Sequence, residues 1–191
     1  MIKKITQQIS ASIAVKEAMF DSCIEDIQAA ASLMIDSIRK DGKILWCGNG
    51  GSAADAQHLA TELMGGMTSH ERRPIPSIAL TTDSSFLTAW SNDTDFESIF
   101  SRQIQGLGKT GDVLIGISTS GNSENVLAAV KQAKYKELST IVLTGRSGGK
   151  INGISDVTIN IPSEDTQRIQ EAHIMVGQIL CGLIEDDLLD E

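Results

Sequence analysis

Short apolar runs and helical patterns alternate along most of this chain. Five runs have the length and the β-branched content of buried strands, and they cover residues 44–47, 77–80, 113–117, 140–144 and 157–161. Segments with helical spacing of apolar residues separate and follow these runs. The alternation is typical of a parallel sheet with helices on both faces, so we expect an α/β fold with a doubly wound, five-stranded parallel sheet.

The chain opens with helix-forming sequence before the first strand. Apolar residues recur at helical spacing from residue 5 to residue 39, which predicts two helices or one bent helix. These helices could cover the chain's own sheet or form an interface between subunits, and the pattern leaves both open. At 191 residues we expect one domain, with residues 1–40 as the helical lead-in and residues 41–191 as the α/β core and C-terminal helix.

The helices predicted between and after the strands have apolar stripes. The helix after the first strand carries Ala53, Ala56, Leu59, Ala60, Leu63 and Met64. The final helix, expected over residues 166–187, directs inward Ile169, Ala172, Val176, Ile179, Leu180 and Leu183. Other helices are expected through residues 84–90, 96–107 and 126–135, with Asn92 and Asp93 in a turn. Residues 65–76 form a polar loop long enough to be a lid.

Composition narrows the range of functions. Lys and Arg number 16 against 25 Asp and Glu, the net charge is −9, and no basic run carries interleaved aromatic residues, so we expect no nucleic-acid-binding surface. No stretch approaches the length of a membrane span, so no membrane partner is expected. Cys23, Cys47 and Cys181 are far apart and in no metal-binding pattern, which predicts buried, reduced side chains. We therefore expect a cytoplasmic protein.

A hydroxyl loop (residues 118–123) lies between the third strand and the next helix. It contains Ser118, Thr119, Ser120 and Ser123. A helix N-terminus leaves N–H groups unpaired and carries partial positive charge, so hydroxyls gathered there can bind a phosphate. Four hydroxyls without a lysine favour a sugar phosphate held by neutral donors. The alternative is that Ser123 caps the helix and its neighbours only form the turn.

A glycine turn (residues 48–52) follows the first strand and leads directly into a helix. It lacks the third glycine of a dinucleotide fingerprint, because Ala53 stands there. Residues 145–151 resemble a Walker loop but also fail, because Thr144 and Ile151 replace its first glycine and its magnesium-binding hydroxyl. The glycine turn and the hydroxyl loop both follow strands, so we expect them to share one crevice.

His58 and Glu62 are four residues apart on the helix after the glycine turn. This spacing places them on one helical face about 6 Å apart along the axis. The pair suits a metal site or acid/base chemistry, but two solvated surface residues would have the same spacing.

Five motifs, in this order, resemble those of the phosphoheptose isomerases, which are sugar isomerase (SIS) domain proteins. They are residues 47–58 (CGNGGSAADAQH), residues 92–93 (ND), residues 116–123 (GISTSGNS), residues 143–145 (LTG) and residues 168–171 (RIQE). The resemblance implies an SIS-type fold. It also implies interconversion of sedoheptulose 7-phosphate and D-glycero-D-manno-heptose 7-phosphate in bacterial heptose biosynthesis, by a homotetramer with active sites between subunits.

The resemblance also implies roles for individual residues. The sugar would contact Asn49, Gly50, Gly51, Ser52, Asn92, Asp93 and Gln170. The phosphate would be held by Ser118, Thr119, Ser120 and Ser123. Glu62 matches the family's catalytic carboxylate, which would act as the base in an enediol mechanism. His58, Glu62 and Gln170 match positions at which some members bind zinc, and Gln178 stands at a fourth.

Two departures from the family pattern concern the chemistry. Gln178 occupies the position of a histidine that serves as acid/base and possible zinc ligand, and Gly66 stands where an arginine is common. We therefore expect a slower isomerase with weaker zinc binding. The alternative is a catalytically weak SIS-domain scaffold, like the replication-initiator-associating relative that lacks the catalytic pair. His173 lies about 140° around the helix from Gln178, so we expect a structural role for it.

Overall fold

The structure, a computed structural model, describes residues 1–189 and contains one five-stranded parallel sheet. The strands, in chain order, are β1 (Ile44–Gly48), β2 (Ser77–Ala79), β3 (Val113–Ser118), β4 (Ser139–Gly145) and β5 (Val157–Ile161). Their order across the sheet is β2-β1-β3-β4-β5, and every neighbouring pair is parallel. The predicted fold class and all five predicted strands are confirmed.

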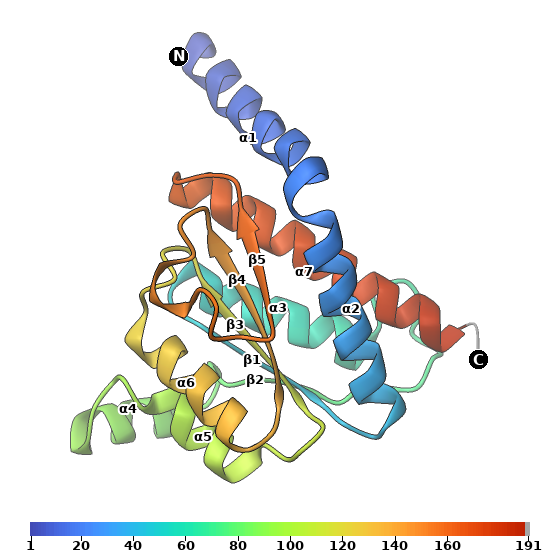
Figure 1. Ribbon diagram of the computed structural model, residues 1–191, viewed down its shortest axis with the longest axis vertical. Coiled ribbons are helices and arrows are strands. Elements are labelled where there is room, and N and C mark those ends of the chain that lie inside the picture. The colour runs from blue at the N-terminus through green and yellow to red at the C-terminus, as the bar shows by residue number, and fades with distance from the viewer. Residues whose placement is uncertain (190–191) are drawn as a thin grey trace.

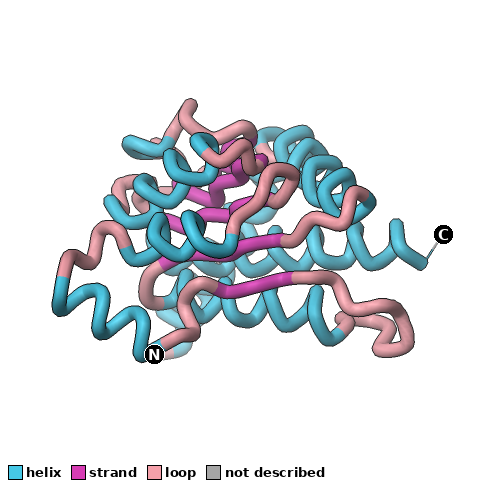
Figure 2. Tube along the Cα trace, turned by 90° about the horizontal axis from the view of Figure 1, so that it is seen from below, coloured by secondary structure: helices cyan, strands magenta, loops and turns pink. Residues whose placement is uncertain are grey.

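Helices cover both faces of the sheet (Figures 1 and 2). One face packs on α2 (Ile24–Arg39), α3 (Gly51–Gly65) and α7 (Thr166–Leu189). The other packs on α5 (Ile99–Leu107) and α6 (Glu124–Tyr135), with α4 (Ser84–Asp93) beside α5. Along β1, Ile44 and Trp46 belong to the first core and Leu45 and Cys47 to the second, because successive strand residues point to opposite faces.

The N-terminal region forms two helices that divide at Cys23. α2 buries Ile27, Ala31 and Met34 against the sheet, so this helix has ordinary intramolecular packing. By contrast, α1 (Ile2–Ser22) extends away from the body of the molecule (Figure 1). Its only buried residue is Met19, and Ile5 and Ile9 are among its exposed apolar residues. The first helix therefore leaves an apolar surface open to solvent.

Three predicted stripe positions are wrong. Met64, Ile179 and Leu183 were expected to face the core, but their exposed fractions are 47%, 42% and 41%. The apolar stripes of α3 and α7 are wider than the surface that the rest of the chain covers, so residues at their edges reach solvent. The three cysteines, by contrast, are buried and free as predicted.

Two helix boundaries differ from the prediction by three residues. α5 begins at Ile99 rather than at residue 96, because the Ser98 backbone N–H donates to Asp95 Oδ1 at 2.6 Å and forms a turn ahead of the helix. Asn92 and Asp93 do not lie in a turn, because α4 continues through Asp93, with Thr94 as its C-cap residue. A short 3₁₀ helix, η1 (Gly149–Ile151), completes the elements of residues 1–189, where no helix has the length and apolar content needed to cross a membrane.

Candidate active site

The sheet has a topological switch point between β1 and β3. The chain leaves β1 for β2 on one side and later returns to β3 on the other. Loops that follow strands at such a point diverge and leave a crevice, where ligands of open α/β sheets bind. Gly48 at the end of β1 pairs with Ile117 near the end of β3, so the glycine turn and the hydroxyl loop are neighbours. The two loops therefore lie side by side at the edge formed by the carboxyl ends of the strands, and each lines a cavity of its own.

The hydroxyl loop is organised by contacts among its own side chains. Ser118 is buried, and its Oγ donates a hydrogen bond to Ser123 Oγ at 3.0 Å. Ser123 is the N-cap residue of α6, but within residues 1–189 its hydroxyl makes no cap hydrogen bond. Ser120 is exposed, and its Oγ accepts from the Asn122 backbone N–H at 3.2 Å. Ser123 therefore occupies the N-cap position without a cap hydrogen bond in the described part of the chain, and the Ser120 hydroxyl takes part in the turn, as the alternative expected. The loop places these hydroxyls at the start of α6.

The glycine turn forms a sharp backbone bend at the start of α3. Gly50 is the N-cap of α3 and has φ +56°, a conformation that favours glycine. Ser52 is buried in the first turn of the helix. A Cβ atom added at Gly51 would lie 2.7 Å from Gln170 Nε2, so the Gln170 side chain from α7 lies directly against this backbone. Four of the predicted sugar-contacting residues and Gln170 are thus gathered at one place.

Asn49 is paired with a residue that the sequence reasoning missed. Its Nδ2 donates to Asn125 Oδ1 at 2.8 Å, and Asn125 Nδ2 donates back to Asn49 Oδ1 at 2.9 Å. Asn125 is buried in the first turn of α6, so this reciprocal amide pair joins the glycine turn to the helix that directly follows the hydroxyl loop. In the sequence, Asn125 stands directly before the apolar Val126 and Leu127 at the start of a predicted helix. An amide at the edge of an apolar stripe needs a hydrogen-bond partner when it is buried, and this was the signal that could have identified it.

The side chains of Asn92 and Asp93 pair with each other. Both are exposed in the last turn of α4, and Asn92 Nδ2 donates to Asp93 Oδ1 at 2.8 Å. Within residues 1–189, no side-chain hydrogen bond joins them to the glycine turn or the hydroxyl loop. Their role as substrate contacts therefore stays a prediction.

His58 and Glu62 form a hydrogen-bonded pair on α3. His58 Nε2 lies 2.8 Å from Glu62 Oε1, and the side chains are 48% and 20% exposed. The predicted stacking on one helical face is confirmed. The carboxylate is the better shielded of the two groups, while its histidine partner faces solvent. This arrangement leaves a base and an imidazole within reach of a ligand from outside the chain.

The four residues matched to zinc ligands come from two helices, His58 and Glu62 from α3 and Gln170 and Gln178 from α7. Gln170 lies at the glycine turn, whereas Gln178 is exposed two turns further along α7. Residues 1–189 contain no group of three His, Cys, Asp or Glu side chains that could hold a metal ion. Zinc prefers imidazole, thiolate and carboxylate donors, and here one imidazole and one carboxylate are accompanied only by amides. This donor set is therefore a weak one for zinc.

His173 has a structural environment. It is fully buried on α7, and its Nε2 lies 3.2 Å from the Thr144 carbonyl oxygen of β4. Burial lowers the pKa of His173 to about 4, because the charged imidazolium is poorly solvated there. At neutral pH the ring is uncharged and links α7 to the sheet, which agrees with the structural role expected for it.

The loop predicted over residues 65–76 is anchored by a buried carboxylate, Glu185, which the sequence reasoning also missed. Glu185 accepts backbone N–H bonds from Met67 at 2.9 Å, Thr68 at 2.6 Å and Ser69 at 2.9 Å. Arg72 Nε donates to Glu185 Oε2 at 2.7 Å. These contacts hold the first half of the segment against α7.

The same network reaches the end of the helix that carries Glu62. Arg72 Nη2 donates to the Glu62 carbonyl oxygen at 2.9 Å. Burial by itself raises the pKa of the Glu185 carboxyl, but hydrogen bonds from Thr68 and Arg72 and from backbone N–H groups outweigh it and hold that pKa well below its ordinary value. An ionised Glu185 thus fixes the position of α7 relative to the C-terminal end of α3.

Comparison with known proteins agrees with this geometry. The SIS domain family model matches residues 8–145 of the chain. The chain is 45% identical to phosphoheptose isomerase of Sulfurimonas denitrificans over 100% of this chain and 98% of the relative. It is 53% identical to phosphoheptose isomerase of Rhodospirillum rubrum over 87% of this chain and 88% of the relative.

Solved structures show the same similarity in three dimensions. The phosphoheptose isomerase of Neisseria gonorrhoeae matches with a TM-score of 0.91 and 45% identity, covering 96% of this chain and 98% of that one. The enzyme of Francisella tularensis matches with a TM-score of 0.93 and 37% identity, covering 97% and 98%. The chain therefore belongs to the SIS-domain family. Within that family its similarity is to the phosphoheptose isomerases, and it is an isomerase that acts on a sugar phosphate.

Proposed function

We propose that this isomerase interconverts sedoheptulose 7-phosphate and D-glycero-D-manno-heptose 7-phosphate in the cytoplasm, as a step of bacterial heptose biosynthesis for the lipopolysaccharide core. The observation that carries the proposal is the meeting of the hydroxyl loop and the glycine turn at the switch point of the sheet. The hydroxyls of Ser118, Thr119, Ser120 and Ser123 bind the phosphate together with the N-terminus of α6. Asn49 and the backbone at Gly50 and Gly51 contact the sugar.

The chemistry moves one proton between neighbouring carbons. Glu62 removes the proton from the carbon next to the carbonyl, an enediol forms, and the proton returns to the adjacent carbon. The hydrogen bond between Glu62 and His58 supports this role, because the imidazole orients the carboxylate. The carbonyl oxygen takes up a proton as the enediol forms, and the neighbouring hydroxyl loses a proton as the new carbonyl forms. Water supplies and accepts these two protons where no titratable side chain stands beside the oxygens.

Gln178 takes the position from which a side-chain proton donor would act. An amide N–H can hydrogen-bond to the carbonyl oxygen, but it cannot transfer a proton. General acid–base help is typically worth ~10²–10⁴-fold, so the expected enzyme is slower than relatives with a histidine there. Zinc, where it binds, would contact His58, Glu62, Gln170 and Gln178 and polarise the carbonyl. We expect weak binding, because two of these four donors are amides.

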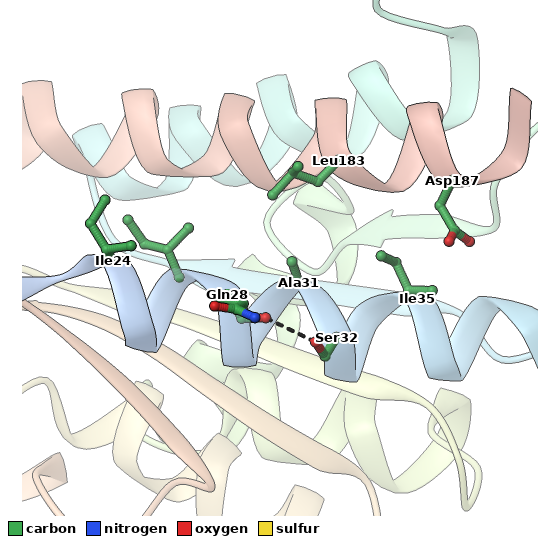
Figure 3. Close-up of a pocket in the computed structure, with 8 residues that line it drawn as sticks. Ile24, Gln28, Ala31, Ser32, Ile35, Leu183 and Asp187 are labelled. Carbon is green, nitrogen blue, oxygen red and sulfur yellow. Dashed lines mark hydrogen bonds between the residues drawn. The ribbon is translucent and has the colours of Figure 1, made fainter. Parts of the chain in front are cut away.

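The assembly proposed for the chain is a homotetramer with active sites between subunits. The support is the apolar surface left uncovered along α1, where Ile2 is 82% and Phe20 73% exposed. A second apolar surface is a groove of about 470 Å³ between α2 and α7, into which Leu183 projects opposite Ile24 and Ile35 (Figure 3). Sedimentation at micromolar concentration should give a tetramer, and a monomer would contradict the proposed assembly.

Turnover of sedoheptulose 7-phosphate by the purified protein tests the function directly. Glu62→Gln should abolish turnover while leaving substrate binding intact, because the amide keeps the shape of the carboxylate and loses its basicity. Gln178→His should raise kcat by up to ~10²–10⁴-fold, because it restores a group that can transfer a proton.

The same pair of variants separates an enzyme from the scaffold alternative. A scaffold that binds the sugar phosphate would respond to neither substitution in a turnover assay. The isomerase proposal fails if the wild-type rate equals that of Glu62→Gln and Gln178→His gains nothing, while both variants fold and still bind the sugar phosphate in calorimetry.

A further inference from the structure

Residues 145–151, which resemble a Walker loop without completing its motif, lie directly against the hydroxyl loop. The Gly145 backbone N–H donates to the Thr119 carbonyl oxygen at 3.0 Å, and the Ile151 N–H donates to the Gly121 carbonyl oxygen at 3.1 Å. The Lys150 N–H donates to Asn122 Oδ1 at 3.0 Å. Three hydrogen bonds spread along the segment therefore hold it on the hydroxyl loop.

The glycines of this segment serve the contact between the two loops. Gly149 has φ +56°, and a Cβ atom there would lie 2.3 Å from the Ser120 carbonyl oxygen. On the other side, Gly121 has φ +63°, and its Cβ would lie 2.0 Å from the Gly148 carbonyl oxygen. Only glycine permits backbones to approach this closely. The glycine-rich sequence is thus explained by loop packing and not by a nucleotide.

A cavity of about 290 Å³ lies where these loops meet the loop that follows β5. Thr119 and Ser120 line one side of it, and Arg146 and Ser147 line another. The Arg146 backbone N–H donates to the Ser163 carbonyl oxygen at 3.1 Å, which fixes the residue between the two strand ends. Arg146 is the only cationic residue in the lining, and its guanidinium makes no hydrogen bond or ion pair with residues 1–189. The one acidic residue of the lining, Glu164, is exposed.

We propose that residues 145–147 form the second wall of the phosphate site and that Arg146 binds the negative charge of the phosphate group. This inference rests on the proposed function, because it takes the hydroxyl loop as the first wall. The hydroxyls are neutral, and the N-terminus of α6 carries only about half a positive charge. Together they would leave most of the charge of a phosphate dianion uncompensated, on a chain whose net charge is −9. A guanidinium can donate two parallel hydrogen bonds to phosphate oxygens, and here it has no competing partner.

Matched variants test the assignment by calorimetry with inorganic phosphate and with sedoheptulose 7-phosphate. Arg146→Gln should weaken both by roughly ten- to hundredfold, the loss expected for hydrogen bonds to a charged group. Arg146→Lys should recover part of the affinity, because it keeps the charge but not the paired geometry. Lys150→Gln removes the same charge four residues away, outside the cavity lining, from a side chain paired with Glu124. It should change either affinity less than twofold.

The pH dependence of sugar-phosphate binding distinguishes recognition of the phosphate charge by Arg146 from structural damage to the loop. A phosphate monoester becomes a dianion with a pKa of about 6, so wild-type affinity should rise between pH 5 and pH 7. That rise should be smaller in Arg146→Gln, whereas damage to the loop alone would lower affinity equally at both pH values. Thermal unfolding checks that each variant is folded, which is expected because the Arg146 side chain is exposed.

The outcomes separate this inference from the isomerase proposal. Wild-type phosphate affinity in Arg146→Gln at both pH values would overturn the assignment even if the protein turns over its substrate normally. An equal loss in Lys150→Gln would also overturn it, because the effect would then be one of overall charge. If the wild-type protein binds phosphate through Arg146 but never isomerises sedoheptulose 7-phosphate, the site stands and the proposed reaction fails.

Discussion

Replacing Glu185 with glutamine tests the network that joins α7 to the end of α3. The substitution keeps the size of the side chain but removes its negative charge. The new amide group would also turn an N–H donor toward backbone N–H groups that now donate to the carboxylate from Met67, Thr68 and Ser69. Arg72 would lose its ionic partner.

The expected loss of folding stability follows from the burial of both charged groups. The Arg72 and Glu185 side chains are 3% and 1% exposed, so solvent cannot replace the missing partner. Breaking a buried ion pair from one side is destabilising by about 3–5 kcal/mol. Domains of this kind are stable by about 5–15 kcal/mol, so the variant should fold at pH 7 but with a large part of its stability lost.

The effect should depend on pH, with a sign set by the lowered pKa of Glu185. A group whose pKa is lower in the folded state stabilises the protein above its unfolded pKa, which is about 4.3 for glutamate. That contribution declines as the pH falls from there toward the folded pKa. The difference between wild type and Glu185→Gln should therefore be full at pH 7 and shrink below about pH 4.

Urea unfolding followed by circular dichroism, at one fixed protein concentration, measures this difference. Asp186→Asn is the matched control, because it removes a charge from the exposed neighbouring position on the same helix. We expect the control to change stability by less than about 0.5 kcal/mol. A loss below about 1 kcal/mol for Glu185→Gln, or a loss equal to that of Asp186→Asn, would refute the role given to the buried carboxylate.

Three further results are expected. Ser120→Ala combined with Ser123→Ala should weaken sugar-phosphate binding by about 1.5–3 kcal/mol per hydrogen bond without unfolding the chain, and unchanged affinity in calorimetry would remove the hydroxyl loop from the site. Asn125→Ala should reduce stability by about 1–3 kcal/mol, because Asn49 loses both of its amide hydrogen bonds. It should also weaken binding of the sugar phosphate more than binding of inorganic phosphate, and equal weakening of the two ligands would contradict this. The wild-type protein should lose zinc on dialysis against a mild chelator, and Gln178→His should retain more of it. Stoichiometric zinc in the dialysed wild-type protein would show that the amide of Gln178 does not weaken zinc binding.

The local pattern of the sequence was sufficient for most of the fold. The central strands β1, β3 and β4 are apolar runs buried on both faces, and the shorter or half-buried β2 and β5 lie at the two edges of the sheet. The helices between the strands repeat their apolar residues with a separate period. The meeting of the glycine turn with the hydroxyl loop was also predictable, because the carboxyl ends of parallel strands share one edge. His58 and Glu62 were found from helical spacing alone.

The sequence could not show which residues at the edge of an apolar helix stripe are covered by other elements. Ile179 and Leu183 repeat with the same period as buried neighbours on α7, but their burial depends on which other elements reach that side. Asn92 and Asp93 have the composition of a turn, yet they form the last residues of α4. Asn and Asp prefer turns only weakly, so this local preference does not end the helix before them.

Tertiary structure alone decided the contacts between residues distant in the chain. Asn49 and Asn125 are 76 positions apart, and Thr68 and Glu185 are 117 apart, so no local pattern links them. Arg146 lies in a segment that matched no complete motif, and it reaches the cavity because β3 and β4 are neighbours in the sheet. Periodicity and turn chemistry act over a few residues and are written in the sequence, whereas the pairing of buried polar groups depends on how the finished elements pack.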